Sequence, residues 1–195
     1  MTKKIAFLGS HGSGKTSTIN FIKNKLESQG KSVEVFTMGW KQFQNPVLRF
    51  FSNIYLRSHY KRNKKEERLD RFKERSMLFY LIYYTELLTK YAEVKRSEAD
   101  FVLMDRYFYE ELMFTKGFKR KILKNLTPIP NEAIVLETNQ KTISLRGHKV
   151  SEEKLRNFYQ KLRDLSREFP MIFIDSSKKY ENIYEEVINP LLNDN

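Results

Sequence analysis

The chain contains no cysteine among its 195 residues. Disulfide bonds, zinc sites with thiolate ligands and cysteine nucleophiles are therefore excluded. Histidine is scarce as well, with three copies scattered along the chain. Because so few nitrogen and sulfur ligands are present, the metal that we expect is Mg²⁺, held by oxygen ligands.

Long apolar runs are also missing. No stretch of the sequence reaches the roughly 20 apolar residues that a membrane-spanning helix needs, and the first residues lack the pattern of a secretory leader. We therefore expect a soluble, cytoplasmic protein without a membrane partner. Since 40% of the residues are hydrophobic, residues 1–195 can build a substantial core, and we interpret them as a single domain.

Glycine is limited to seven residues, yet three of them fall within one stretch of eight. Residues 9–16 spell GSHGSGKT, which matches the GxxxxGK(S/T) pattern of a phosphate-binding loop, or P-loop. An apolar run precedes this stretch and apolar residues at helical spacing follow it, so the glycines lie where a strand gives way to a helix N-terminus. A glycine-rich turn that binds nothing is the alternative, and the strand and helix context favours binding of a nucleoside triphosphate.

The positions of the P-loop predict individual roles. Lys15 is expected to reach the β- and γ-phosphates of ATP, and the hydroxyl of Thr16 is expected to bind Mg²⁺. We expect ATP to contact the whole segment, which comprises Gly9, Ser10, His11, Gly12, Ser13, Gly14, Lys15, Thr16 and Ser17.

Acidic residues are in deficit, with 24 Asp and Glu against 36 Lys and Arg, a formal net charge of +12. This balance suits anionic partners, which include nucleotides and nucleic acids. A basic, helix-rich insertion covers residues 41–75, and its part from 57 to 75 carries nine Lys or Arg against four Asp or Glu. That segment fits either a patch that attracts an anionic partner or a solvated helix face, and the lysine-rich run at 116–124 leaves the same alternatives open.

Five short apolar runs predict the strands of one sheet. They cover residues 5–8, 33–36, 101–104, 133–136 and 171–174. Because the runs are apolar on both faces and helical patterns separate them, the sequence predicts a three-layer α/β fold, with a five-stranded parallel sheet flanked by helices. Residues 77–84 are apolar or aromatic throughout, which predicts a helix buried on every side.

A second motif, Asp105, Arg106 and Tyr107, follows the third apolar run directly. Open α/β sheets bind ligands beyond the carboxyl ends of their strands, where a carboxylate can face the P-loop. Asp105 could hold the Mg²⁺ water shell or orient an attacking oxygen, and Arg106 could bind a phosphate with two N–H groups. The alternative is an aspartate that caps the next turn and pairs with the arginine.

Together, GSHGSGKT at 9–16 and FVLMDRYFYEELMF at 101–114 resemble the thymidylate kinase family of P-loop nucleoside monophosphate kinases. The segment from 133 to 146 and MIFIDSS at 171–177 extend the resemblance over nearly the whole chain. It implies a P-loop kinase fold and transfer of a phosphoryl group from ATP to a nucleoside monophosphate, dTMP above all. It also implies that Asp105 and Arg106 lie at the acceptor phosphate.

The chain departs from the family pattern on the acceptor side. An Arg-Glu-Pro is usual after the second strand, where this chain has TMGWK at 37–41. The family's arginine on the helix before the third strand is replaced by Tyr83 or a neighbour, with Arg75 about two turns earlier. A second branch of the family, which carries a Trp after the second strand, resembles this chain better. The residues expected to contact the acceptor are Trp40, Arg75, Tyr83, Arg106 and Tyr107, although Trp40 could instead pack at the edge of the core.

The resemblance also implies a short lid at residues 139–151. Phosphoryl transfer needs a cation besides Lys15 and Mg²⁺, and the P-loop contains no arginine. Arg146 is the leading candidate, so the expected catalytic set is Lys15, Asp105, Arg106 and Arg146. Arg146 could instead pack on the adenine ring or pair with a helix carboxylate.

Two classes of function remain. The first is a kinase of a small acceptor, either a monophosphate or a sugar or nucleoside hydroxyl. The second is a nucleotide-dependent protein that binds nucleic acid. Neither a guanine-reading motif nor a second domain is visible, which favours the kinase and makes nucleic acid the less favoured partner. The number of assembled chains is left open, with a homodimer among the alternatives.

Overall fold

The computed structural model describes residues 2–39, 50 and 77–193. Trp40 and Arg75 lie outside the described residues. So does the basic insertion at 41–75, apart from Phe50.

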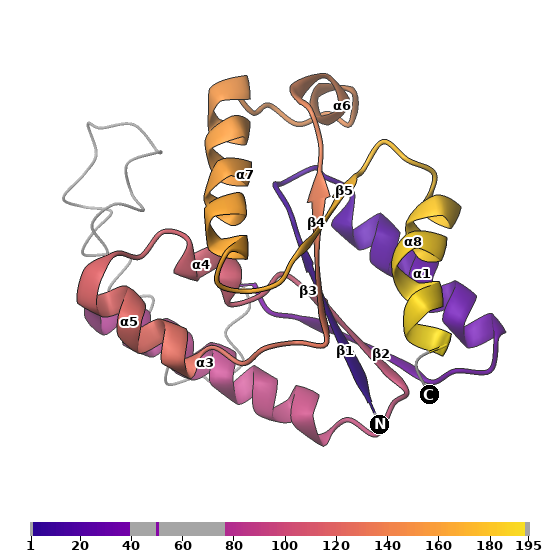
Figure 1. The fold of residues 1–195 in the computed structure, drawn as a ribbon, viewed down its shortest axis with the longest axis horizontal. Helices are drawn as coiled ribbons and strands as arrows, with labels where there is room; N and C mark the ends of the chain where they lie inside the picture. The colour runs from indigo at the N-terminus through magenta and orange to yellow at the C-terminus, as the bar shows by residue number, and fades with distance from the viewer. Residues whose placement is uncertain (1, 40–49, 51–76, 194–195) are drawn as a thin grey trace.

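A parallel sheet of five strands forms the centre of the described structure (Figure 1). Its order is β2-β3-β1-β4-β5, and all four pairings are parallel. The strands are β1 (Lys3–Leu8), β2 (Val33–Thr37), β3 (Phe101–Asp105), β4 (Glu132–Glu137) and β5 (Ile172–Asp175). The five predicted strands are therefore confirmed. Since all of them run in one direction, their carboxyl ends meet at one edge of the sheet.

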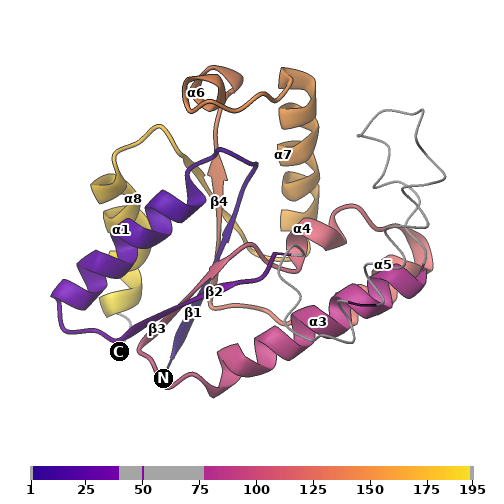
Figure 2. The same ribbon diagram turned by 180° about the vertical axis from the view of Figure 1, so that it is seen from behind.

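Helices cover both faces of the sheet, as Figures 1 and 2 show from opposite sides. On one face, α1 (Lys15–Ser28) and α8 (Tyr180–Asn193) pack on Ile5, Phe7 and Leu103. On the other face, Ala6 and Leu8 point toward the remaining helices. These are α3 (Met77–Arg96), α4 (Tyr109–Leu112), α5 (Gly117–Leu126), α6 (Gln140–Leu145) and α7 (Glu152–Ser166). Successive side chains of β1 thus point to opposite faces of the sheet and contribute to a hydrophobic core on each face. This arrangement confirms the three-layer α/β fold. Within the described residues, no helix combines the length and the apolar character needed to cross a membrane.

Burial is less complete than the apolar runs predict. Val35 on β2 is 41% exposed and Ile172 on β5 is 36% exposed. Both belong to edge strands, which have a neighbouring strand on one side only. The expectation that residues 77–84 are buried on every side is also wrong, because Leu81 on α3 is 44% exposed. A helix that packs on one face of a sheet leaves part of its circumference to solvent, even where its sequence is apolar.

Candidate active site

The P-loop connects β1 to α1, as the sequence predicts. Its three glycines, Gly9, Gly12 and Gly14, have φ values of +148°, +81° and +93°. Residues with a side chain rarely adopt this region. Space is limiting as well, since a β-carbon on Gly9 would lie 2.7 Å from Ser13 Oγ. Glycine is therefore required here to fold the backbone tightly around an anion, and α1 begins directly afterwards at Lys15.

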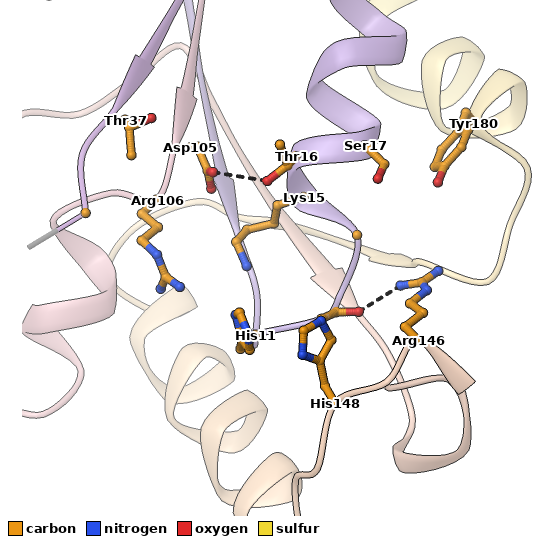
Figure 3. A pocket seen from close by; sticks show the side chains of 13 residues that line it. His11, Lys15, Thr16, Ser17, Thr37, Asp105, Arg106, Arg146, His148 and Tyr180 are labelled. Carbon is orange, nitrogen blue, oxygen red and sulfur yellow. Dashed lines mark hydrogen bonds between the residues drawn. The ribbon is translucent and has the colours of Figure 1, made fainter. Parts of the chain in front are cut away.

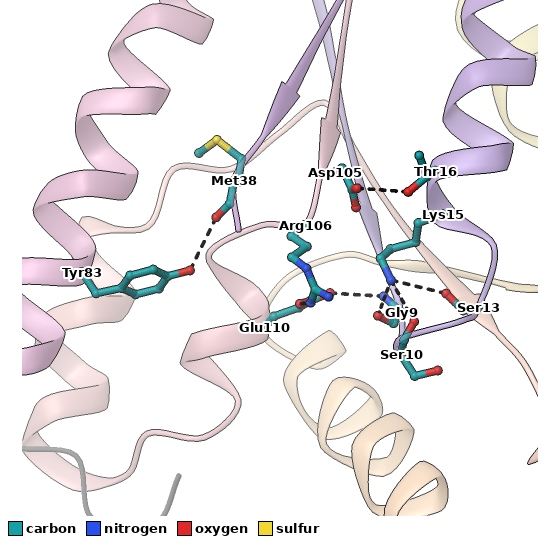
Figure 4. Close-up of polar contacts among 10 residues, drawn as sticks. All are labelled: Gly9, Ser10, Ser13, Lys15, Thr16, Met38, Tyr83, Asp105, Arg106 and Glu110. Carbon is teal, nitrogen blue, oxygen red and sulfur yellow. Dashed lines mark hydrogen bonds and ion pairs between the residues drawn. The ribbon is translucent and has the colours of Figure 1, made fainter. Parts of the chain in front are cut away.

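The Lys15 side chain folds back across the P-loop (Figure 4). Its ammonium donates hydrogen bonds to the carbonyl oxygens of Gly9 and Ser10, at 2.7 and 2.9 Å. Only 6% of the residue is exposed. Burial lowers the pKa of Lys15, and the negative charge of Glu110 opposes this shift. The positive charge is thus held inside the loop, where it can act on the phosphates of a bound nucleotide.

Thr16 and Asp105, the two residues that the sequence predicts as Mg²⁺ ligands, meet at the carboxyl end of β3. The Thr16 hydroxyl donates to Asp105 Oδ2 at 3.5 Å (Figure 3). Asp105 Oδ1 is buried and has no hydrogen-bond partner among the described residues. A hydroxyl and a carboxylate are the oxygen ligands that Mg²⁺ prefers, and the ion usually completes its shell with water and phosphate oxygens. Although the described part of the chain holds no cluster of three or more His, Asp or Glu, this pair fits that kind of binding.

Arg106 has a left-handed backbone, with φ +70°, although it is not glycine. Its N–H donates to the carbonyl oxygen of Phe7 at 2.9 Å, which anchors the turn to β1. The guanidinium forms an ion pair with Glu110 on α4. Glu110, four residues after Arg106, was not predicted as a site residue, and because Arg106 precedes α4 with a left-handed backbone this pair is not a regular contact within one helix. The arginine therefore points toward the P-loop, with its side chain half-buried (Figure 4).

Arg146, at the end of α6, contacts the P-loop and the segment after β5. Its guanidinium donates to the carbonyl oxygen of Gly12 at 3.0 Å and to that of Ser176 at 3.3 Å. His148, two residues further on, packs edge-on against His11, with the ring centroids 4.3 Å apart (Figure 3). Arg146 and His148, which belong to the segment predicted as a lid, thus contact the P-loop. His148 was missed by the sequence analysis because nothing local links it to the loop.

A cavity of about 700 Å³ joins these elements, within the range of small-molecule sites, roughly 300–1,000 Å³. From the predicted set, the cavity is lined by His11, Gly12, Gly14, Lys15, Thr16, Ser17, Asp105, Arg106 and Arg146. Lining residues that were not predicted are Thr37, Gly39, His148 and Tyr180 (Figure 3). The structure thus brings the P-loop, the Asp105–Arg106 motif and Arg146 to one cavity.

Two predicted acceptor residues lie elsewhere. Tyr83 is buried on α3 and its hydroxyl donates to the carbonyl oxygen of Met38 at 3.5 Å. Tyr107 is buried among aromatic rings and donates to the carbonyl oxygen of Pro128 at 3.0 Å. Neither tyrosine is among the described residues that line the cavity. Their placement corrects the expectation of direct acceptor contact, because each ring fills the core and each hydroxyl is used by a backbone carbonyl.

Tyr159 on α7 is a supporting residue that the sequence analysis missed. Its hydroxyl donates to the carbonyl oxygen of Leu136 at 3.0 Å and lies 3.2 Å from Ser10 Oγ. Burial raises the pKa of this hydroxyl, so it stays protonated and available as a donor. Tyr159 therefore ties the P-loop to the end of β4.

Comparison with known proteins supports the resemblance found in the sequence. No protein-family model matches the chain. The probable thymidylate kinase 1 of Saccharolobus solfataricus is 23% identical over an alignment of 205 positions that covers 96% of each protein. The resemblance to the thymidylate kinase family is thus confirmed over nearly the whole chain.

Solved structures share the fold at lower sequence identity. Thymidylate kinase from Candida albicans matches 98% of this chain and 91% of its own, with a TM-score of 0.63 and 13% identity. Deoxyadenosine kinase from M. mycoides, solved with the products dCMP and a flexible dCDP, matches 97% of this chain and 98% of its own. Its TM-score is 0.60 at 16% identity. These matches confirm the α/β fold with its five-stranded parallel sheet.

Proposed function

We propose that the protein is an ATP-dependent nucleotide kinase that transfers the γ-phosphoryl group of ATP to a nucleoside monophosphate, with dTMP as the first candidate. One observation carries the proposal. Lys15, the Thr16–Asp105 pair and Arg106 converge on a single cavity, although Thr16 at the start of α1 and Asp105 at the end of β3 are 89 residues apart. The curated relative, a probable thymidylate kinase, supports the same reaction class.

On the donor side, the P-loop binds the phosphates of ATP through backbone N–H groups and Lys15. The Lys15 ammonium already lies within the loop, so its charge acts on the γ-phosphate as negative charge develops during transfer. Thr16 and Asp105 would hold Mg²⁺, which neutralises phosphate oxygens when bound. The Asp105 carboxylate lines the cavity and serves either that shell or the orientation of the acceptor oxygen.

On the acceptor side, Arg106 is the cation that lines the cavity beside Asp105. A guanidinium has five N–H donors, so Arg106 can keep its ion pair with Glu110 and still bind the acceptor phosphate. The arginine thus brings the attacking oxygen of that phosphate toward the γ-phosphate of ATP.

Arg146 retains two roles in this proposal. Its hydrogen bonds to Gly12 and Ser176 place the guanidinium against the P-loop backbone. From there it either stabilises the transition state or packs on the adenine ring. Steady-state kinetics of Arg146→Ala separate these roles, because loss of a transition-state contact lowers kcat whereas loss of an adenine contact raises the KM for ATP.

The proposal is tested by measuring ADP release with a panel of acceptors. The panel contains dTMP, the other deoxynucleoside and nucleoside monophosphates, and the free nucleosides, and products are identified by mass spectrometry. We expect a monophosphate to stimulate ADP release and to appear as the diphosphate. Arg106→Ala should raise the KM for that acceptor and lower kcat, since a phosphate clamp acts in both ground and transition states.

Lys15→Met provides the control against a contaminating kinase, because the activity must disappear with it. If no monophosphate is phosphorylated and a nucleoside is, the acceptor class changes to a hydroxyl. If no member of the panel yields a phosphorylated product, the kinase assignment is wrong.

A further inference from the structure

Glu110 places a buried carboxylate between the acceptor arginine and the P-loop. Its Oε2 pairs with the guanidinium of Arg106, and its Oε1 accepts a hydrogen bond from the Gly9 N–H at 3.4 Å. Only 8% of the residue is exposed. Both carboxylate oxygens are therefore engaged, one by each half of the site (Figure 4).

A carboxylate in a site for phosphates is costly in two ways. It must lose its hydration on burial, and its charge reduces the attraction of the site for anions. The Arg106 pair offsets the first cost. The second cost remains, so the benefit of Glu110 must come from something other than binding anions directly.

Arg106 is confined at more than one point along its side chain. Its backbone is fixed in the left-handed region by the hydrogen bond to Phe7. Its Cδ passes close to Gly39, where an added β-carbon would lie 3.2 Å away. Glu110 fixes the far end, the guanidinium itself. A long side chain restrained in this way loses little further conformational entropy when it binds a ligand.

We propose that Glu110 is a positioning residue that holds the guanidinium of Arg106 at a fixed distance from the P-loop. The bridge runs from Gly9 through the Glu110 carboxylate to Arg106, so the donor loop and the acceptor cation share one fixed spacing. In-line transfer depends on that spacing, because a displacement of about 1 Å in a reacting group can cost about 10²-fold in rate. The inference rests on the function proposed above.

Glu110→Gln is the direct test, with Glu111→Gln as the matched control. Both glutamates are buried on α4, but the charge of Glu111 acts on Tyr84. We expect Glu110→Gln to raise the KM for the acceptor and to lower kcat/KM by about tenfold to 10²-fold. The KM for ATP should change much less. Glu111→Gln should leave both KM values unchanged, even if its melting temperature falls by as much as that of Glu110→Gln.

A double-mutant cycle distinguishes positioning of Arg106 by Glu110 from a general structural effect of the Glu110 substitution. In an Arg106→Ala background the guanidinium is gone, so Glu110→Gln should cost little further activity. An equal loss of kcat/KM in both backgrounds would overturn the inference. If Glu110→Gln does not fold, Glu110→Asp provides the same comparison against Glu111→Asp, because the shorter carboxylate keeps its charge and moves away from Arg106.

Wild-type turnover in the same assay distinguishes the two levels of the proposal. Wild-type activity together with unaltered kinetics of Glu110→Gln would overturn the positioning role alone. Absence of wild-type turnover with every acceptor would overturn the kinase function, and the positioning role with it.

Discussion

The hydroxyl of Thr16 lies 3.5 Å from Asp105 Oδ2, although 89 residues separate them in the chain. The contact follows from the sheet. Strands β1 and β3 are parallel neighbours, and Phe7 at the end of β1 is in register with Asp105 at the end of β3. The P-loop and the Asp105–Arg106 turn therefore leave the sheet side by side.

Asp105→Asn should leave ATP binding in place while reducing phosphoryl transfer by about 10²-fold to 10³-fold. The amide keeps the shape of the side chain but removes the negative charge that favours Mg²⁺. ATP affinity is measured by calorimetry, and turnover is measured over a Mg²⁺ titration. The variant should need more Mg²⁺ than the wild type. Reduced turnover with an unchanged Mg²⁺ profile would assign Asp105 to orienting the acceptor oxygen, and unchanged turnover would leave it a structural role only.

Lys15→Met should lower kcat by about 10²-fold or more without unfolding the protein. Methionine matches the length of the lysine stem, so the change removes mainly the charge and the hydrogen bonds to Gly9 and Ser10. Circular dichroism checks the fold, and ADP release checks the turnover. Near-normal turnover by the folded variant would remove the basis for the P-loop assignment.

The same variant should raise thermal stability at neutral pH. Burial lowers the pKa of Lys15 in the folded protein below the value of 10.5 for an exposed lysine. The unfolded chain therefore binds the proton more tightly, and the charged side chain destabilises the fold at neutral pH. This cost fades as the pH rises from the lowered pKa toward 10.5. Melting curves at neutral pH and near pH 10.5 should show an advantage of Lys15→Met that shrinks with pH. A variant less stable than the wild type at neutral pH would contradict the prediction.

Tyr159→Phe should destabilise the protein by about 1 kcal/mol, because it removes the hydroxyl that bonds to Leu136 and Ser10. Tyr184→Phe is the matched control, since that hydroxyl bonds to Gln29 at the C-terminal end of α1, opposite the end that joins the P-loop, and lies on the other face of the sheet. Melting temperatures should fall for both variants. The KM for ATP should rise for Tyr159→Phe alone, and an equal rise for both would refute a link between Tyr159 and the loop.

Oligonucleotides should not stimulate ATP turnover, despite the net charge of +12. Binding of single- or double-stranded oligonucleotides should weaken steeply with salt, because it depends on neutralising many phosphates. Binding of an acceptor monophosphate in the cavity should depend on salt only weakly, because few charges are involved and they are partly buried. Salt titrations of both affinities make the comparison. Stimulation by oligonucleotide, without any phosphorylated small product, would favour the nucleic-acid-binding alternative.

The strands could be predicted because each one is a short apolar run, and the parallel sheet followed from runs that are apolar on both faces. Exposure could not be predicted in the same way. Val35 and Ile172 have the same residue types as Val135 on β4 and Ile5 on β1, which are fully buried, yet both lie on edge strands. Strand order depends on how the helices pack, and no local pattern in the sequence records it.

For the site, the sequence by itself determined the P-loop, since the loop is built from eight consecutive residues whose backbone geometry requires glycine at set positions. It also determined that Asp105 would lie at the carboxyl end of a buried strand. Only the tertiary structure decided that Glu110 joins Arg106 to Gly9, and that Arg146 reaches Gly12 from 134 residues away. It likewise decided that Tyr83 and Tyr107 fill the core instead of the cavity. An aromatic ring suits both environments equally well, so its place depends on which elements pack around it.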